Sequence, residues 1–315
     1  MRRRRYLKAL AASTATISIA GCGGDGGDGG SSDGEDGGGS DGSDGDDGGS
    51  DGSDGDDGGD MEDGDDGEDN PFGLEDGVVT IGSDIPYKPF EFRNEEGELK
   101  GFDPEMAQAI YEDEMGLDYE FQKTAWDGII ASLNNGNFRV IMSAMTINDE
   151  RDERVDFSDP YFTAYQTVAI LENSDISSKD DLKGKAVGVQ KGTTGEGAAE
   201  QLKEEFDGDL EIQSYDQITG AFDALINGQV AAVVNDNTVN VEFAEEQDPV
   251  VMLEGEGAAE EAGQDAPDYL TLTVENYGIA FREDDDEFLQ AVNEALAAVK
   301  ESGTYDEIYS KYFAG

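Results

Sequence analysis

Cys22 is the only cysteine of this 315-residue chain, and the sequence contains no histidine. Histidine is the commonest general base and the commonest metal ligand, so its absence excludes a zinc site and a Ser-His-Asp mechanism. A lone cysteine also excludes a disulfide framework. Cys22 follows a short apolar segment headed by Arg2 to Arg5. This arrangement is typical of a secretory signal that is cut just before the cysteine.

The run Ile19-Ala20-Gly21-Cys22 resembles the lipobox of bacterial or archaeal lipoproteins. That resemblance implies that residues 1–22 are a signal peptide and that the Cys22 thiol receives a diacylglycerol. The alternative is a buried structural cysteine, which the small, flexible neighbours disfavour. No other apolar stretch approaches ~20 residues, so we expect a lipid anchor and no membrane-spanning helix.

The export route is indicated by Arg3-Arg4-Arg5-Tyr6-Leu7-Lys8. This segment resembles the twin-arginine consensus, in which an aromatic residue, leucine and lysine follow the arginine pair. A merely basic n-region is the alternative. The twin-arginine route exports folded proteins, so we expect the mature chain at the extracytoplasmic face of the membrane.

Residues 23–72 are almost entirely Asp, Gly and Ser. Such a tract buries too little apolar surface to offset its chain entropy, which predicts a disordered tether that like charges keep extended. Calcium binding by the Asp-Gly repeats is the alternative. It is disfavoured because EF-hand spacing and a fixed nonapeptide period are both missing.

The net charge of −55 is not confined to the tether. Residues 1–72 hold 20 of the 75 acidic and five of the 20 basic residues, which leaves 55 and 15, or about −40, for residues 73–315. Such a charge repels itself strongly in dilute buffer, whereas ~1 M salt shortens the Debye length to ~3 Å. The composition therefore suggests a halophilic protein and disfavours nucleic acid as a partner.

The folded part alternates strands and helices, which predicts an α/β fold. Val78 to Ile81 is expected to be a buried strand, and Asp103-Pro104 an N-cap and first-turn proline of a helix that ends near Met115. A strand over 186–190 leads into a glycine turn and another helix. A long helix over 285–301 and a short one over 305–312 close the chain.

The sequence contains two similar units, each made of a helix, an Asn-Gly cap and then a strand. Residues 127–136 lead into a strand over 138–142, and residues 221–228 lead into a strand over 230–234. Chance similarity is the alternative to a true repeat. Two similar α/β lobes are the simplest explanation, with strand ends facing a crevice where such sheets bind ligands.

Six motifs in order resemble the extracellular solute-binding proteins, family 3, of polar amino-acid ABC transporters. The resemblance covers roughly residues 76 to 314. They are DIPYKPFEF (84–92), GFDPEMAQAI (101–110), MTINDERDERVDFSDPYF (145–162), VGVQKGTTGE (187–196), VVND (233–236) and GTYDEIYSKYF (303–313).

The resemblance implies a two-lobed, type II periplasmic-binding-protein-like fold with the ligand between the lobes. Lobe one would comprise 76–168 and 276–315, and lobe two 172–272, with chain crossings near 166–172 and 272–278. The implied partners of this monomer are a free amino acid and a membrane permease, without a cofactor or metal.

The same resemblance assigns the ends of the amino-acid ligand. Arg151 matches the arginine that clamps the ligand carboxylate, which a guanidinium can do bidentately. Asp236 matches the acid that pairs with the α-ammonium. An exposed ion pair for Arg151 and a helix cap for Asp236 are the alternatives. Further contacts are expected from strand ends and a helix start: Ser143, Ala144, Thr146, Thr193 and Thr194.

Specificity rests on four other positions. Tyr87 and Trp126 match aromatic or apolar walls of the family site, although both could instead pack in a core. Asp84 stands where basic-amino-acid binders hold the distal cation and glutamine binders accept the amide. Gln190 stands where a glutamine binder would carry lysine. This departure favours a basic amino acid, arginine or lysine.

Two other functions occur on the same fold. Cyclohexadienyl (arogenate) dehydratases would need a carboxylic acid beside the leaving group, for which Glu91 or Asp84 could serve. A sensor domain docked on a membrane receptor is the second alternative. The lipid anchor and the amino-acid clamp favour a transport protein that is not an enzyme.

The acidic surface generates a prediction about salt. We expect the fold to be lost below about 0.5 M salt, because carboxylate repulsion is then no longer screened. Circular dichroism across a salt series measures this loss. Full stability in dilute buffer would argue against a halophilic protein.

Overall fold

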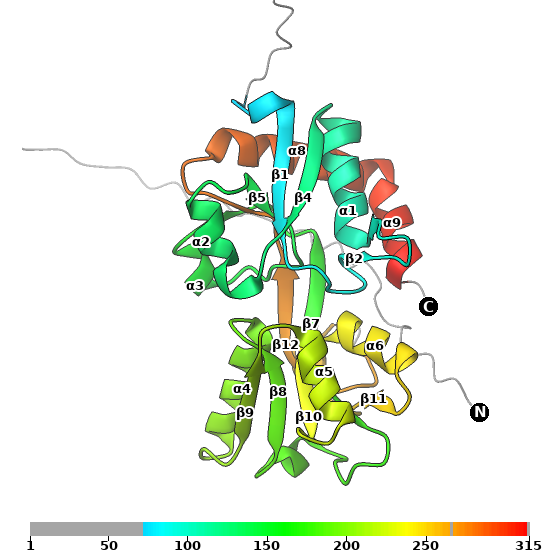
Figure 1. Ribbon diagram of the computed structural model, residues 1–315. Coiled ribbons are helices and arrows are strands. Elements are labelled where there is room, and N and C mark those ends of the chain that lie inside the picture. The colour runs from blue at the N-terminus through cyan, green and yellow to red at the C-terminus, as the bar shows by residue number, and fades with distance from the viewer. Residues whose placement is uncertain (1–71, 265–266, 314–315) are drawn as a thin grey trace, which may run out of the picture. The chain divides into compact units, whose positions relative to one another are not determined.

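The structure, a computed structural model, describes residues 72–264 and 267–313. They belong to one compact unit, shown in Figure 1 as two sheets with helices packed around them. The expected signal peptide, Cys22 and the tether up to residue 71 lie outside the described residues. None of the described helices is long and apolar enough to cross a membrane.

The first sheet has five strands and organises what we call lobe one. Strand β1 pairs in parallel with both β4 and β5, whereas β13 pairs antiparallel with β5 and β6. In sheet order the strands are β4 (Asp118–Lys123), β1 (Val78–Ser83), β5 (Val140–Ile141), β13 (Ala280–Phe281) and β6 (Asp156–Phe157). A separate hairpin joins β2 (Phe92–Arg93) to β3 (Leu99–Lys100).

The second sheet has six strands and organises lobe two. Strands β10, β8 and β9 run parallel to one another, and β7 pairs antiparallel with β10, β11 and β12. Its strands are β11 (Val250–Met252), β7 (Phe162–Leu171), β10 (Ala232–Asp236), β8 (Ala186–Gln190), β9 (Glu211–Tyr215) and β12 (Thr271–Tyr277).

Helices accompany both sheets. Those of lobe one are α1 (Phe102–Ala107) with its π-helical continuation (Gln108–Glu114), α2 (Ile129–Asn134), α3 (Asp149–Asp152), α8 (Asp286–Ser302) and α9 (Thr304–Phe313). Those of lobe two are α4 (Thr194–Glu205), α5 (Ile218–Ile226), α6 (Asn237–Glu246) and α7 (Ala258–Glu261). Short 3₁₀ turns occupy Glu75–Gly77, Trp126–Gly128 and Lys179–Leu182.

Two long strands connect the lobes. β7 and β12 run side by side between the sheets in Figure 1, paired from Phe162 with Tyr277 to Thr167 with Thr271. The chain crossings near 166–172 and 272–278 stay a prediction, and these strands cover residues 162–171 and 271–277. The repeated units are also observed, because α2 precedes β5 and α5 precedes β10. These findings confirm the expected two-lobed α/β fold.

The expected role of Asp103 as an N-cap is wrong. The N-cap lies two residues earlier, at Gly101, whose φ of 133° no other residue adopts readily, and no side chain caps the helix. Asp103 lies inside α1, fully buried, and its carboxylate accepts hydrogen bonds from Ala144 N (2.9 Å) and the Tyr161 hydroxyl (3.0 Å). The acid therefore braces the chain after β5.

The core of lobe one is rich in aromatic rings contributed by distant segments. Phe162 lies 5.0 Å from Phe90 and 4.8 Å from Phe313, measured between ring centroids. The last helix is therefore part of this core, and edge and tilted ring contacts stabilise it beyond simple burial. In lobe two, apolar clusters cover both faces of the sheet.

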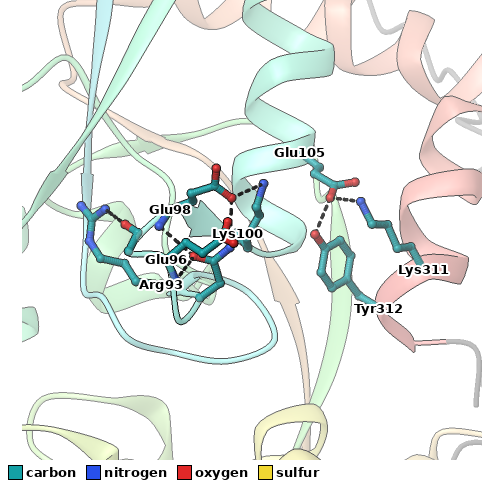
Figure 2. A network of polar contacts seen from close by, with 9 residues as sticks. Arg93, Glu96, Glu98, Lys100, Glu105, Lys311 and Tyr312 are labelled. Atoms are coloured by element: carbon teal, nitrogen blue, oxygen red, sulfur yellow. Dashed lines mark hydrogen bonds and ion pairs between the residues drawn. The ribbon is translucent and has the colours of Figure 1, made fainter.

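A polar contact holds α9 against α1 at the surface. Figure 2 shows the Glu105 carboxylate of α1 accepting from the Lys311 ammonium and the Tyr312 hydroxyl of α9. A solvent-exposed ion pair contributes little stability by itself. The aromatic packing therefore does most to hold α9, while Glu105 sets its orientation.

Candidate functional site

One cavity lies at the carboxyl ends of strands from both sheets. All eleven cavity residues predicted from the sequence line it, together with Gln166 and Asn235. The predicted residues are Asp84, Tyr87, Trp126, Ser143, Ala144, Thr146, Arg151, Gln190, Thr193, Thr194 and Asp236.

Arg151 lines the cavity and is buried, with 7% of its surface exposed. Asn148 caps α3 by accepting from the Arg151 backbone N–H at 2.9 Å. The guanidinium donates from Nη1 to the Thr146 carbonyl at 2.7 Å and lies 5.1 Å from the centroid of the Trp126 ring. These contacts fix the side chain and exclude the alternative of an exposed arginine.

No carboxylate in the described ranges forms an ion pair with Arg151. Burial lowers the pKa of Arg151, although the charges of Glu275 and Asp236 oppose that change. Buried charges in proteins are normally paired. An unpaired guanidinium beside a cavity therefore favours an anionic group in the cavity.

Asp236 ends β10 and supplies a buried negative charge. Its carboxylate accepts from the Tyr87 hydroxyl and from Gln166 Nε2. Although Asp236 precedes α6, its side chain makes no capping hydrogen bond, which rules out the capping alternative in this structure. Burial raises the pKa of Asp236 to about 7, and the nearby Glu275 charge adds to this rise. A cation in the cavity would favour its ionised form.

A second acid, Asp84, lies where β1 ends. Its two oxygens accept from Gln190 Nε2 (2.6 Å) and Gln217 Nε2 (2.9 Å), both from lobe two. Its backbone N–H donates to Ser143 Oγ at 2.9 Å. Burial raises the pKa of Asp84, which the Gln190 hydrogen bond partly opposes. Two carboxamides thus hold an acid without neutralising it.

Several predicted contacts serve the site indirectly. Ser143 Oγ donates to the buried Glu91 carboxylate at 2.6 Å, and Ala144 adopts a positive φ of 47°. Thr193 caps α4 by accepting from the Glu196 backbone N–H at 3.2 Å. The backbones at these positions are therefore better placed than the side chains to contact a ligand.

The sequence analysis missed four polar residues of the site. Gln166 and Asn235 line the cavity, and Asn235 Oδ1 lies 3.0 Å from the Tyr87 hydroxyl oxygen. Gln217 holds Asp84, and Glu275 accepts hydrogen bonds behind the cavity wall. Position in a predicted crossing was an available signal for Gln166 and Glu275, and adjacency to Asp236 was one for Asn235.

The two lobes touch around the cavity. Trp126 Nε1 of lobe one donates to the Gly192 carbonyl of lobe two at 2.8 Å. Lys191 forms an ion pair with Asp127 at 2.8 Å across the same boundary. The described arrangement is therefore a closed one. Within the described ranges no group of three or more acidic, cysteine or histidine residues is arranged to hold a metal ion.

Comparison with known proteins shows which family of proteins the chain resembles. Residues 79–315 match the family model described as bacterial extracellular solute-binding proteins, family 3. A probable histidine-binding protein of Neisseria gonorrhoeae is 34% identical over 241 residues, which cover 75% of this chain and 83% of that protein.

Solved structures resemble the chain as well. An ancestral arginine-binding protein bound to arginine is 37% identical, with a TM-score of 0.66, and the match covers 75% of this chain and 98% of that one. The ancestral amino acid-binding protein AncCDT-1, a precursor of cyclohexadienyl dehydratase, is also 37% identical. Its TM-score is 0.64, and the match covers 76% of this chain and 96% of that chain.

The displaced pKa of Asp236 predicts how stability depends on pH. From about pH 4 to 7 the folded protein retains a proton that the unfolded chain has released, so the free energy of unfolding falls as pH rises. Raising the pKa from 3.8 to about 7 is worth on the order of 4 kcal/mol. Asp236→Asn should therefore flatten the pH dependence of ligand-free unfolding, measured with denaturant at high salt.

The control is Asp223→Asn, which removes an exposed carboxylate on α5. It should leave the slope of unfolding free energy against pH unchanged. An Asp236→Asn protein with the wild-type slope would show that Asp236 does not carry this proton.

Proposed function

Because the chain belongs to the bacterial extracellular solute-binding proteins, family 3, we propose that it binds a free polar amino acid outside the cell and delivers it to an ABC transporter permease. It acts as a monomer without a cofactor. Its role is binding and release, with no chemical step.

The observation that carries this proposal is the pair of opposite, unpaired charges at one cavity. Arg151 is a buried cation without an ion-pair partner among the described residues, and Asp236 is a buried acid hydrogen-bonded only to neutral groups. A zwitterion brings a carboxylate and an ammonium on one carbon. Such a ligand pairs both charges at once, and burial strengthens each pair.

Asp84 narrows the ligand to a basic amino acid, arginine or lysine. It adds a second acid to the cavity, 4% exposed, whose partners Gln190 and Gln217 are neutral. A ligand that complements all three groups carries one negative and two positive charges. The likeness to an ancestral arginine-binding protein bound to arginine supports the same assignment.

Transport follows from hinge closure. The ligand contacts Arg151 in lobe one and Asp236 in lobe two, so its binding favours the closed state over the open one. The moving bodies are 76–168 with 276–315, and 172–272. Opening at the permease separates the two charges and releases the amino acid.

A dehydratase activity has weaker support. The AncCDT-1 neighbour is itself described as an amino acid-binding protein. Glu91, one candidate acid, is fully buried and does not line the cavity, so it has no access to a substrate in this arrangement. Asp84 is held by two carboxamide donors, an arrangement suited to binding a cation.

The clamp predicts a large loss of affinity in Arg151→Ala. Removing the guanidinium leaves the ligand carboxylate unpaired in a dry cleft, which costs about 2–5 kcal/mol, or thirtyfold or more in affinity. Calorimetric titration with arginine and lysine at high salt measures the loss. Arg154→Ala, an exposed arginine three residues away, should bind normally. A loss of less than about threefold in Arg151→Ala would reject the clamp.

The same titrations test the ligand class through Asp84→Ala. Affinity for arginine or lysine should fall far more than affinity for a neutral amino acid such as glutamine, because only the cationic ligand loses a charge partner. Equal losses for the two kinds of ligand would remove Asp84 from the specificity argument.

We also propose that the mature chain is a lipid-anchored protein of the extracytoplasmic membrane face, exported by the twin-arginine route. The support is the sequence alone, since Cys22 and the arginine pair lie outside the described residues. Cys22→Ser should move the exported protein from the membrane fraction to the medium, because no thiol remains for acylation. A Cys22→Ser protein that stays in the membrane fraction would contradict the anchor.

A further inference from the structure

Glu275 accepts four hydrogen bonds just behind the cavity. It lies on β12 with 7% of its surface exposed. Its Oε2 accepts from Thr146 Oγ1 (2.6 Å), Thr194 Oγ1 (2.8 Å) and Gln166 Nε2 (3.2 Å), and its Oε1 accepts from Thr273 Oγ1 (2.9 Å). Glu275 itself does not line the cavity, whereas Thr146, Thr194 and Gln166 do.

The donors to Oε2 come from three parts of the fold. Thr146 follows β5 of lobe one, Thr194 begins α4 of lobe two, and Gln166 lies on the connecting strand β7. One oxygen atom therefore joins the two lobes where the chain crosses between them. The hydroxyls of Thr146 and Thr194 also lie within 3.3 Å of each other, so both halves of this wall converge on the same acceptor.

This arrangement decides what each threonine can offer a ligand. A hydroxyl has one proton to donate, and in both residues that proton is committed to Glu275. Within the described chain neither the Thr146 nor the Thr194 backbone N–H donates to another residue. Each amide thus remains for a ligand anion, the Thr194 amide at a helix N-terminus where anions are favoured.

We propose that Glu275 is a positioning residue, which holds Thr146 and Thr194 from behind so that their backbone amides form one anion-binding wall only when the lobes are together. This rests on the proposed function. Glu275 contributes no contact to the ligand, and its effect passes through the two threonines.

The sign of the charge makes the inference testable. Glu275 is an acid close to the subsite proposed for the ligand carboxylate, and its charge partly offsets the fall that burial causes in the pKa of Arg151. If only charge mattered, removing this acid would reduce repulsion and tighten binding. If positioning matters, replacing the acid by glutamine weakens binding, because a neutral carboxamide has one acceptor oxygen in place of two and holds the hydroxyls less strongly than a carboxylate does.

The experiment is a double-mutant cycle on the full protein at high salt, titrated with arginine. We expect Glu275→Gln to weaken binding by about tenfold or more and Thr194→Val by about fivefold or more. The double variant should be no more than about twofold weaker than Glu275→Gln alone, because both changes break one contact. Glu204→Gln, an equal charge change at an exposed site on α4, should stay within about twofold of wild type.

Trp126 provides a second readout, since it is the only tryptophan of the chain and its indole N–H reaches across the lobes to Gly192. Its emission should reach the wild-type end point in Glu275→Gln, at higher arginine concentration. That result would show that the fold is intact and that closure of the two lobes is less favourable than in the wild type. Should Glu275→Gln fail to fold, the two Thr194 variants test the inference instead. Thr194→Ser, which keeps the hydroxyl, should bind arginine with near wild-type affinity, whereas Thr194→Val should bind more weakly.

Three outcomes would overturn the inference. If Glu275→Gln binds arginine as well as or better than wild type, Glu275 acts only through its charge. If the loss of affinity in the double variant equals the product of the two single losses, Glu275 and Thr194 act separately. If Thr194→Val binds arginine like wild type, the hydrogen bond between Thr194 and Glu275 does not contribute to binding. A wild-type protein that binds none of the twenty amino acids would instead refute the proposed function, and the role of Glu275 with it.

Discussion

A guanidinium buried without a resident counter-ion is the constraint on which this site depends. Arg151 is fixed by its own helix cap, the Thr146 carbonyl and the Trp126 ring, none of which neutralises it. Asp236 has the opposite charge and the same lack of a partner. Desolvating both costs free energy, and in the function proposed above the closed protein recovers it when a zwitterion fills the cavity. An arrangement unfavourable by itself thereby becomes selective for a ligand that carries both charges.

The fold supplies this constraint by placing strand ends from two sheets against each other. Parallel strands in each lobe end at the cavity, so the loops that follow them carry the polar groups. The interior of each lobe then braces those loops. Asp103 holds the Ala144 amide and Glu91 accepts from Ser143, so buried acids of lobe one set the cavity floor without reaching it. The ligand groups and their supports come from different segments of the chain.

Much of this could be predicted from the sequence, because strand ends, caps and crossings leave local signals. The structure has the glycine turn before α4 and both helix-strand units where the sequence motifs predict them. Arg151 and Asp236, which the motifs single out, both line the cavity. The failures share a physical cause. Asp103 has the local pattern of a cap, but a tertiary partner outside its own helix decides its role. Gln217 acts through a contact with Asp84, which lies far away in the sequence, and no local pattern reports such a contact.

The dependence of lobe one on the end of the chain has a consequence for biosynthesis. Its sheet includes β13, residues 280–281, and its helix α9 packs on α1. The core of lobe one therefore lacks Phe313 until residue 313 has been synthesised. Lobe two draws its strands from one stretch between Phe162 and Tyr277. On the ribosome, lobe two can therefore assemble first, while the earlier-synthesised residues of lobe one wait for their C-terminal partners. A premature stop within the final helix removes part of the first lobe's interior and spares the second.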